Sequence, residues 1–233
     1  MYLKLNHYLI YSMEEYFKQW MKVINREEVI KVLTYLSGLP KFPPVYPKAS
    51  EIFKAFELCN YDELKVVMIG QDPYPQKDVA TGILFGNREE TIKLSPSLEL
   101  IKENVIDYSK PTMMNPIKFD ITLESWAKQG ILMLNSALTV EANKVGSHTM
   151  LWRPFIISLL SELSDKKMGI FYVLFGETAK TFKPYINVEL NWIYEYKHPA
   201  YYARLGTKSD YDVFEKINKI LLNSNNIKIN WYD

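Results

Sequence analysis

Three side chains that can transfer protons or form hydrogen bonds stand just after short apolar runs, far apart in the chain: Asp72, Asn135 and His198. A short apolar run bounded by Gly or Pro is typical of a strand that is buried on both faces. If the runs are parallel strands, their carboxyl ends meet at one edge of a sheet, where open α/β folds bind ligands. We therefore expect an acid, an amide and an imidazole at one site. The preceding runs are residues 66–69, 131–134 and 192–196.

This set of groups restricts the reactions that the site can support. No Ser or Cys stands at a strand-end elbow, which argues against acyl transfer, and neither GxxxxGK[ST] nor GxGxxG occurs. The groups suit a reaction that develops positive charge near a carboxylate and negative charge near a hydrogen-bond donor. Cleavage of a glycosidic C–N bond is such a reaction, because the sugar becomes cation-like and the base leaves as an anion. Only one acid lies in these loops, whereas a glycoside hydrolase would use two.

Strand-like runs alternate with segments of helical period, for example residues 97–106 and 154–163. In the second segment Pro154 is expected at the helix start. The alternation predicts an α/β fold: a single domain over residues 1–233 with a central, mainly parallel four-stranded sheet and helices on both faces. The expected strands are residues 66–69, 131–134, 170–175 and 192–196.

The first part of the chain, from about residue 13 to residue 36, is helical in character. An irregular connection with four prolines follows at residues 38–50. Residues 51–59 then have the pattern of a short helix leading to the first strand.

Composition sets the broad class of the protein. Hydrophobic residues make up 48% and charged residues 24% of 233 residues, as in soluble globular proteins. The net charge of +1 gives no global basic field, so DNA binding would use local patches. One cysteine, Cys59, expected to be buried, and three histidines argue against a disulfide and against a metal site. Neither a signal peptide nor a membrane span is evident, and we expect a cytoplasmic protein.

Several motifs in order carry a resemblance to a known family. They are GQDPYP, ATGILFGN, LMLNSALTV with a following SH, and KHPAYYARLG, supported by YPKASEIFKAF, LSPSLELIKENV and a terminal INW. Together they resemble family 1 uracil-DNA glycosylases from about residue 20 to residue 231. The resemblance implies hydrolysis of the N-glycosidic bond of deoxyuridine in single- or double-stranded DNA. The product is an abasic site in base-excision repair, and no metal or cofactor is implied.

The resemblance also implies roles for single residues. Asp72 is similar to the catalytic acid that positions a water and stabilises the cation-like sugar. His198 is similar to a neutral histidine that donates a hydrogen bond to O2 of uracil. Asn135 resembles the amide that pairs with N3–H and O4 of the base. Tyr74 resembles the ring that blocks the 5-methyl group of thymine, and Phe85 the ring that stacks on the flipped base.

Gln71 is implied to lie at the pocket wall and to contribute through its backbone. The segment after His198 departs from the family pattern, in which His-Pro-Ser-Pro-Leu-Ser supplies a leucine wedge and two serines that contact phosphates. Ala200 and Ala203 replace the serines, and Tyr202 takes the wedge position. Two further departures are Pro75 in place of a histidine and Glu177 in place of a serine.

For these reasons we expect Tyr202 or Tyr201 to fill the gap that the flipped base leaves. Arg204, with Lys197 and Lys208, would replace part of the lost phosphate grip as point charges. The residues expected to contact DNA are Pro96, Ser97, Tyr201, Tyr202 and Arg204.

Two other functions stay open from the residues alone. One is a non-catalytic DNA-binding or processivity subunit on the same fold, although a binder needs none of Asp72, Asn135 and His198. The other is a glycosidase for free nucleosides, which the missing serines slightly favour. For the glycosylase we expect a monomer, uracil-containing DNA as partner, no membrane, and a protein inhibitor that mimics DNA.

Overall fold

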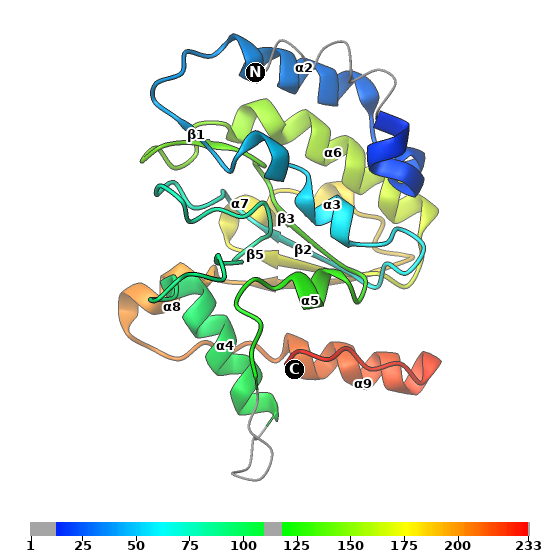
Figure 1. The fold of residues 1–233 in the computed structure, drawn as a ribbon. Coiled ribbons are helices and arrows are strands. Elements are labelled where there is room, and N and C mark those ends of the chain that lie inside the picture. The colour runs from blue at the N-terminus through cyan, green and yellow to red at the C-terminus, as the bar shows by residue number, and fades with distance from the viewer. Residues whose placement is uncertain (1–12, 110–117, 233) are drawn as a thin grey trace.

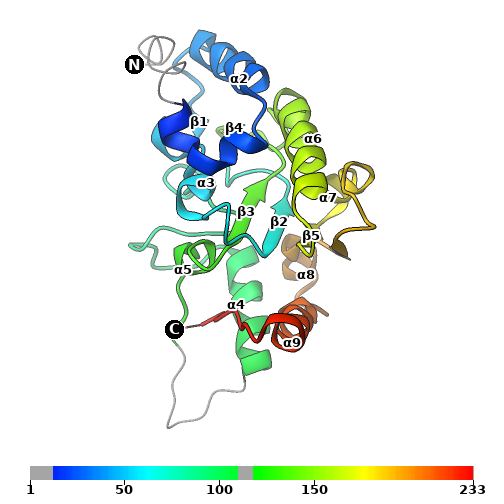
Figure 2. The same ribbon diagram turned by 90° about the vertical axis from the view of Figure 1, so that its right-hand side faces the viewer.

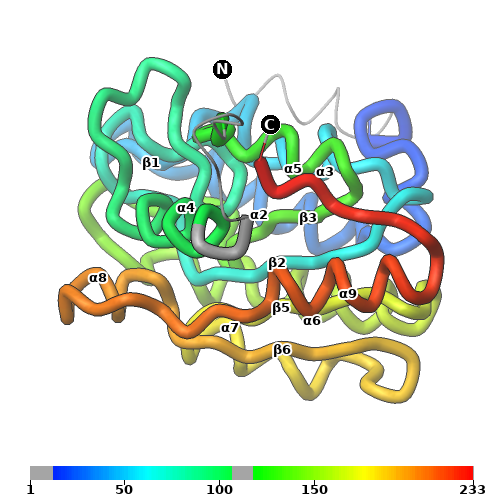
Figure 3. Tube along the Cα trace, turned by 90° about the horizontal axis from the view of Figure 1, so that it is seen from below, coloured from blue at the N-terminus to red at the C-terminus, as the bar shows by residue number. Residues whose placement is uncertain are grey.

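A four-stranded parallel sheet forms the centre of the computed structural model, which describes residues 13–109 and 118–232. The strands lie in the order β3, β2, β5, β6, as Figure 3 shows from below. The predicted fold class and the four predicted strands are confirmed. The strands are β2 (Val66–Gly70), β3 (Ile131–Asn135), β5 (Phe171–Phe175) and β6 (Trp192–Tyr196).

Apolar side chains on both faces of β2, β3 and β5 explain why these runs form strands. All residues of β2, β3 and β5 are buried. Because side chains alternate along a strand, Val67 and Ile69 enter one core, while Val66 and Met68 enter the core on the other face. The described helices cover both faces accordingly (Figures 1 and 2).

The helices divide between the two faces of the sheet. One face carries α2 (Arg26–Gly38), α3 (Lys54–Leu58), α6 (Thr149–Lys166) and α7 (Glu177–Lys180). The other carries α4 (Pro96–Ser109), α5 (Glu124–Ala127), α8 (Pro199–Leu205) and α9 (Val213–Asn225). Three short 3-10 helices are η2 (Lys18–Lys22), η3 (Ala49–Glu51) and η4 (Lys183–Tyr185).

A second, two-stranded sheet was not predicted. In it β1 (Val45–Tyr46), from the proline-rich connection, pairs antiparallel with β4 (Val140–Glu141). Cys59 is buried as predicted, and burial raises the pKa of its thiol to about 12. Within the two described ranges, no helix is long and apolar enough to cross a membrane.

Two helix boundaries differ from the prediction. Helix α6 starts at Thr149, so Pro154 lies inside it rather than at its start. A proline there removes only the bond that its own N–H would make to the carbonyl of Met150, and the apolar stripe of α6 packs on the sheet regardless. The helical region at residues 13–36 is interrupted before α2, where the side chain of Asn25 accepts from the N–H groups of Glu27 and Glu28.

The end of the chain is held against α5 and α9 by tryptophans. The Trp231 side chain is fully buried, and its Nε1–H donates to the Phe214 carbonyl (3.2 Å). In return the Trp231 carbonyl accepts from Nε1–H of Trp126 (3.0 Å). The Trp231 ring packs edge-to-face on Trp126 and Phe214, each with centroids 5.0 Å apart. This cluster supports the face of the sheet that carries α4 and α8.

We predict that Trp231→Ala lowers the free energy of unfolding by about 3–5 kcal/mol, because it leaves a large buried cavity. Urea denaturation measures this change. The control is Ile227→Ala, whose wild-type side chain is 37% exposed. This change is expected to lower the free energy of unfolding much less than Trp231→Ala does, since surface changes are usually within about 0.5 kcal/mol. Equal losses in the two variants would contradict the assigned packing.

Candidate active site

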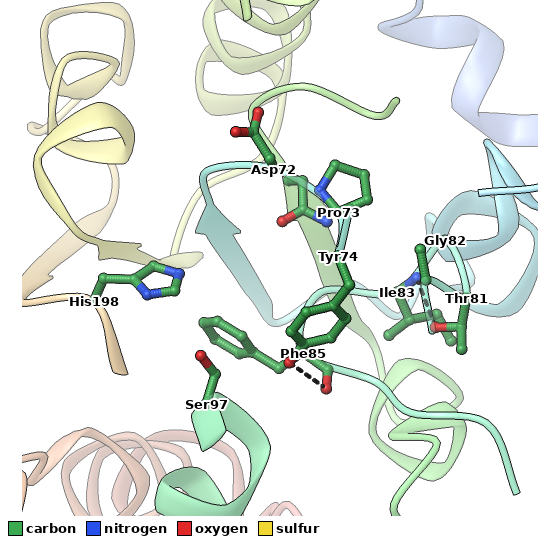
Figure 4. Close-up of a pocket in the computed structure, with 11 residues that line it drawn as sticks. Asp72, Pro73, Tyr74, Thr81, Gly82, Ile83, Phe85, Ser97 and His198 are labelled. Atoms are coloured by element: carbon green, nitrogen blue, oxygen red, sulfur yellow. Dashed lines mark hydrogen bonds between the residues drawn. The ribbon is translucent and has the colours of Figure 1, made fainter. Parts of the chain in front are cut away.

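A hollow opens beyond the carboxyl ends of the strands and holds about 330 Å³, counted out to its mouth. Most of the residues predicted for the site line it together (Figure 4). The structure thus brings together side chains from loops that follow β2, β3 and β6, as the strand-end argument predicted. The predicted residues that line the hollow are Asp72, Tyr74, Phe85, Ser97, Asn135 and His198.

Strand pairing brings the first two loops together. Gly70 at the end of β2 is the register partner of Asn135 at the end of β3. Past the strands, the N–H of Ser136 donates to the Gly70 carbonyl and that of Ala137 to the Gln71 carbonyl, both at 3.0 Å. The backbone before Asp72 is therefore held by the backbone after Asn135, and the two side chains keep a fixed relation.

The carboxylate of Asp72 has one bonded and one unbonded oxygen. Its Oδ2 accepts from the N–H of Gly146 (2.7 Å) and from Nε2–H of Gln71 (3.3 Å). Its Oδ1 is buried and has no hydrogen-bond partner among the described residues. Burial raises the pKa of Asp72, and the bond from Gly146 opposes that rise. A buried acceptor without a partner is costly, so Oδ1 is a strong site for a water or a positive charge.

His198 is a neutral hydrogen-bond donor. Its Nδ1 accepts from the N–H of Ala200 (3.2 Å), where His198 caps the start of α8. This bond places the ring proton on Nε2. Burial, and then the positive charge of Arg204, lower the pKa of His198 to about 4. At neutral pH the imidazole is therefore uncharged and has Nε2–H to donate.

Gly176 makes room for His198. A Cβ at this position would lie 2.9 Å from Cβ of His198, and Gly176 has φ +89°, a value that favours glycine. Its N–H donates to the Tyr196 carbonyl (2.9 Å), which links the end of β5 to the residues just before His198. The absence of a side chain here lets the imidazole sit against the end of the strand.

Two aromatic rings form the apolar part of the hollow (Figure 4). Phe85 is 5% exposed and packs edge-to-face on His198 (5.5 Å) and on Phe175 (5.3 Å). Its φ of +63° is rare for a bulky side chain, and such strain persists where the surroundings impose it, often at functional sites. The hydroxyl of Tyr74 donates to the Phe85 carbonyl (3.3 Å), so this bond links the two aromatic residues of the hollow.

Asn135 offers its amide to the hollow. Its side chain is 7% exposed and makes no hydrogen bond to another described residue. Gln71 is not among the residues that line the hollow, and its side chain donates to the carboxylate of Asp72. Its carbonyl is occupied by Ala137 N–H and Ser136 Oγ–H (2.9 Å).

Of the five residues expected at DNA, three are exposed, Ser97 lines the hollow, and Tyr202 is buried. Pro96 is exposed at the start of α4, Arg204 is exposed on α8, and Tyr201 is 37% exposed. Tyr202 is only 8% exposed, and its hydroxyl donates to Asp210 (2.5 Å). The reason is helical spacing: in α8, which begins at Pro199, residues 199 and 202 face inward and residue 201 faces solvent.

Some residues at the site were not singled out from the sequence. Gly146, which donates to Asp72, and Gly176 have no functional side chain that the sequence could reveal. A glycine close in sequence to a predicted site residue is nevertheless a signal that the backbone approaches the site. His148 is buried, and its Nδ1 lies 2.8 Å from Thr139 Oγ1. Glu177 is exposed and pairs with Lys180 (2.8 Å), which offsets its charge. In the described ranges no cluster of three or more His, Cys, Asp and Glu is placed to hold a metal ion.

Taken together, a carboxylate with a free oxygen, a neutral imidazole donor, an amide and two rings define an enzyme class. These are the groups that the sequence analysis expected for cleavage of the bond between a base and its sugar.

Comparison with known proteins gives the family. The profile of the Uracil DNA glycosylase superfamily matches residues 56–222. The uracil-DNA glycosylase of Campylobacter lari is 39% identical over 202 residues, which cover 84% of each chain. The chain belongs to the uracil-DNA glycosylase superfamily, as its resemblance to family 1 predicted.

Solved structures agree on the fold. Mimivirus uracil-DNA glycosylase superposes with a TM-score of 0.72 at 24% identity, over 95% of this chain and 92% of that one. A second mimivirus structure, of the UNG variant Y322F in complex with UGI, has a TM-score of 0.73 at 24% identity and covers 97% of this chain and 87% of that one.

We predict that His198 titrates near pH 4 and carries its proton on Nε2 at neutral pH. Burial disfavours the charged imidazole, so the neutral form persists as the pH falls and is lost only below about pH 4. Nitrogen-15 NMR of the ring, assigned with His198→Gln, measures the tautomer and the pKa. A titration between pH 6 and 7, near the ordinary histidine pKa of about 6.5, or a proton on Nδ1, would contradict the assigned state.

Proposed function

We propose a division of labour in this pocket for the removal of uracil from DNA, the reaction of the superfamily to which the chain belongs. One observation carries it: the unpartnered Oδ1 of Asp72 and the neutral His198 line the same hollow. A DNA-binding subunit without catalysis would need neither feature.

In the proposed reaction the bond between C1′ of the sugar and N1 of uracil breaks, and its electron pair stays on N1. Negative charge spreads to O2 of uracil, where Nε2–H of His198 donates a hydrogen bond. The cation-like C1′ is stabilised by the carboxylate of Asp72. A water oriented by Oδ1 adds to C1′, and the proton that it loses passes to Asp72. The pKa of Asp72, raised by burial, suits it to accept that proton.

Base selectivity follows from the other lining residues. Uracil and cytosine differ by a swap of donor and acceptor on one edge, and the amide of Asn135 is proposed to read it. A mispaired buried amide costs about 1–3 kcal/mol. Tyr74 is proposed to exclude the 5-methyl group of thymine by shape, and Phe85 to stack on the base. Stacking returns about 1–3 kcal/mol, which offsets part of the cost of flipping the base out of the duplex.

We predict that Asp72→Asn lowers uracil excision by at least about hundredfold, because it removes the charge and the proton acceptor. The assay uses a labelled oligonucleotide with one uracil, without added metal, and alkali breaks the strand at each abasic site. Asp78→Asn is the matched control: the same change on an exposed side chain six residues away, expected to act like wild type. Full activity in Asp72→Asn would contradict the assigned role.

At the duplex, we propose that Tyr201 fills the gap left by the flipped base. Its ring is exposed beside Lys197, whose Nζ lies 4.2 Å from the ring centroid and donates to the hydroxyl (3.2 Å). Tyr202 would first have to leave the core and break its bond to Asp210. Pro96 and Ser97 at the start of α4, with Arg204 on α8, are proposed to contact the DNA backbone.

We predict that Tyr201→Ala lowers kcat/KM on duplex substrate by about tenfold and changes single-strand cleavage much less, because only a duplex has a gap to fill. Tyr35→Ala, an exposed tyrosine of α2 on the opposite side of the sheet (Figure 1), is the control. Equal losses on both substrates, or no loss on duplex, would show that Tyr201 has another role.

A protein partner is also proposed. A mimivirus UNG variant, whose fold this chain shares, forms a complex with UGI. This supports the proposal that a DNA-mimicking protein inhibitor binds this chain over the mouth of the hollow. The composition supports a single-domain monomer in the cytoplasm.

A further inference from the structure

The hydroxyl of Tyr74 is held by two residues that do not line the hollow. It lies 2.5 Å from Oγ of Ser95, and Nδ2–H of Asn87 donates to the same Oγ (3.1 Å). The N–H of Ser95 donates back to Oδ1 of Asn87 (2.8 Å). Asn87 and Ser95 thus bond each other twice and present one hydroxyl to Tyr74. We call this pair the Asn87–Ser95 clasp.

The bonds form a chain with one consistent direction. Burial raises the pKa of Tyr74 to about 12, so its phenol keeps its proton. Asn87 donates to Ser95, Ser95 donates to the Tyr74 oxygen, and Tyr74 donates to the Phe85 carbonyl (3.3 Å). Every donor in this chain has an acceptor, and hydrogen bonds in such chains strengthen one another.

The clasp is itself anchored to the framework of the fold. Asn87 is fully buried, and its N–H donates to the Ile121 carbonyl (2.9 Å). The Ser95 carbonyl accepts from the N–H of Glu99 (3.0 Å) in the first turn of α4. The ring of Tyr74 therefore cannot shift without breaking a bond to a fixed element.

We propose that Ser95 and Asn87 are specificity-determining positioning residues, which reject 5-substituted pyrimidines by holding the Tyr74 ring still. The proposal rests on the assignment of Tyr74 as the wall against the 5-methyl group. A wall excludes a methyl group only if it does not yield, because a ring that shifts by about an ångström would admit it. The stiffness of the wall, and not its presence alone, then sets the discrimination.

The test compares kcat/KM for three single-stranded oligonucleotides that carry uracil, 5-fluorouracil or thymine. Single strands remove any difference in base pairing. In Ser95→Ala, which removes only the hydroxyl, the thymine-to-uracil ratio is expected to rise by about tenfold, the equivalent of one hydrogen bond. The 5-fluorouracil-to-uracil ratio of kcat/KM is expected to stay near the wild-type value, because the fluorine substituent is small. Asn87→Asp, which keeps the acceptor but loses the donor, is expected to shift the ratios in the same direction.

Matched variants separate this role from a loss of stability. Ser164→Ala removes a buried serine hydroxyl that accepts from Asn187 N–H (2.9 Å) outside the hollow, and its ratios are expected to equal those of wild type. Ser95→Thr restores a hydroxyl and is expected to restore rejection of thymine. Tyr74→Phe removes the hydroxyl that Ser95 contacts, which is the Tyr74 side of the same hydrogen bond. Its shift in ratio and that of Ser95→Ala are expected not to add in the double variant.

Two outcomes would overturn the proposal. One is an unchanged thymine-to-uracil ratio in Ser95→Ala and in Tyr74→Phe. The other is an equal change in Ser164→Ala, which would mark a general effect of stability. Thermal melting of each variant shows that the measured protein is folded. Wild type that leaves uracil intact would instead contradict the proposed function, so the two failures are distinct.

Discussion

A single hydrogen bond, from the N–H of Gly146 to Oδ2 of Asp72 (2.7 Å), sets the state of the carboxylate at the centre of the site. It stabilises the charged form of a buried acid and fixes its orientation, while Oδ1 stays without a partner among the described residues. A carboxylate bonded on both sides would be stable but inert, and one bonded on neither would be protonated or mobile. Oδ2 of Asp72 thus accepts from the N–H of a glycine that lies in a loop far along the chain.

The same burial acts on both titratable groups of the hollow. It raises the pKa of Asp72 and lowers that of His198 to about 4. The N–H of Gly146 favours the charged form of the acid and opposes the effect of burial, whereas the N–H of Ala200 donates to Nδ1 and favours the neutral imidazole. The neutral ring, held by Ala200 N–H, keeps a donor for the charge that forms on the leaving base.

The strand ends could be predicted from the sequence because short apolar runs of four to six residues, as at 66–69, 131–134 and 170–175, are typical of strands buried on both faces of a parallel sheet. That placed Asp72, Asn135 and His198 at one edge. The orientation of Tyr202 could not be predicted, because it depends on where α8 begins and on which face packs inward. Gly146 and the Asn87–Ser95 clasp were missed since they act through loops whose approach is set by tertiary packing. The motif likeness predicted residues that line this hollow but not the Asn87–Ser95 clasp.

The central claim is that loops from distant parts of the chain form one preorganised uracil pocket. A crystal structure of the protein with free uracil tests it most directly. The account predicts the ring stacked on Phe85, its N3–H and O4 on the Asn135 amide, its O2 at Nε2 of His198, and its N1 edge toward Asp72. Uracil bound elsewhere, or bound in the hollow with N1 facing away from Asp72, would contradict it.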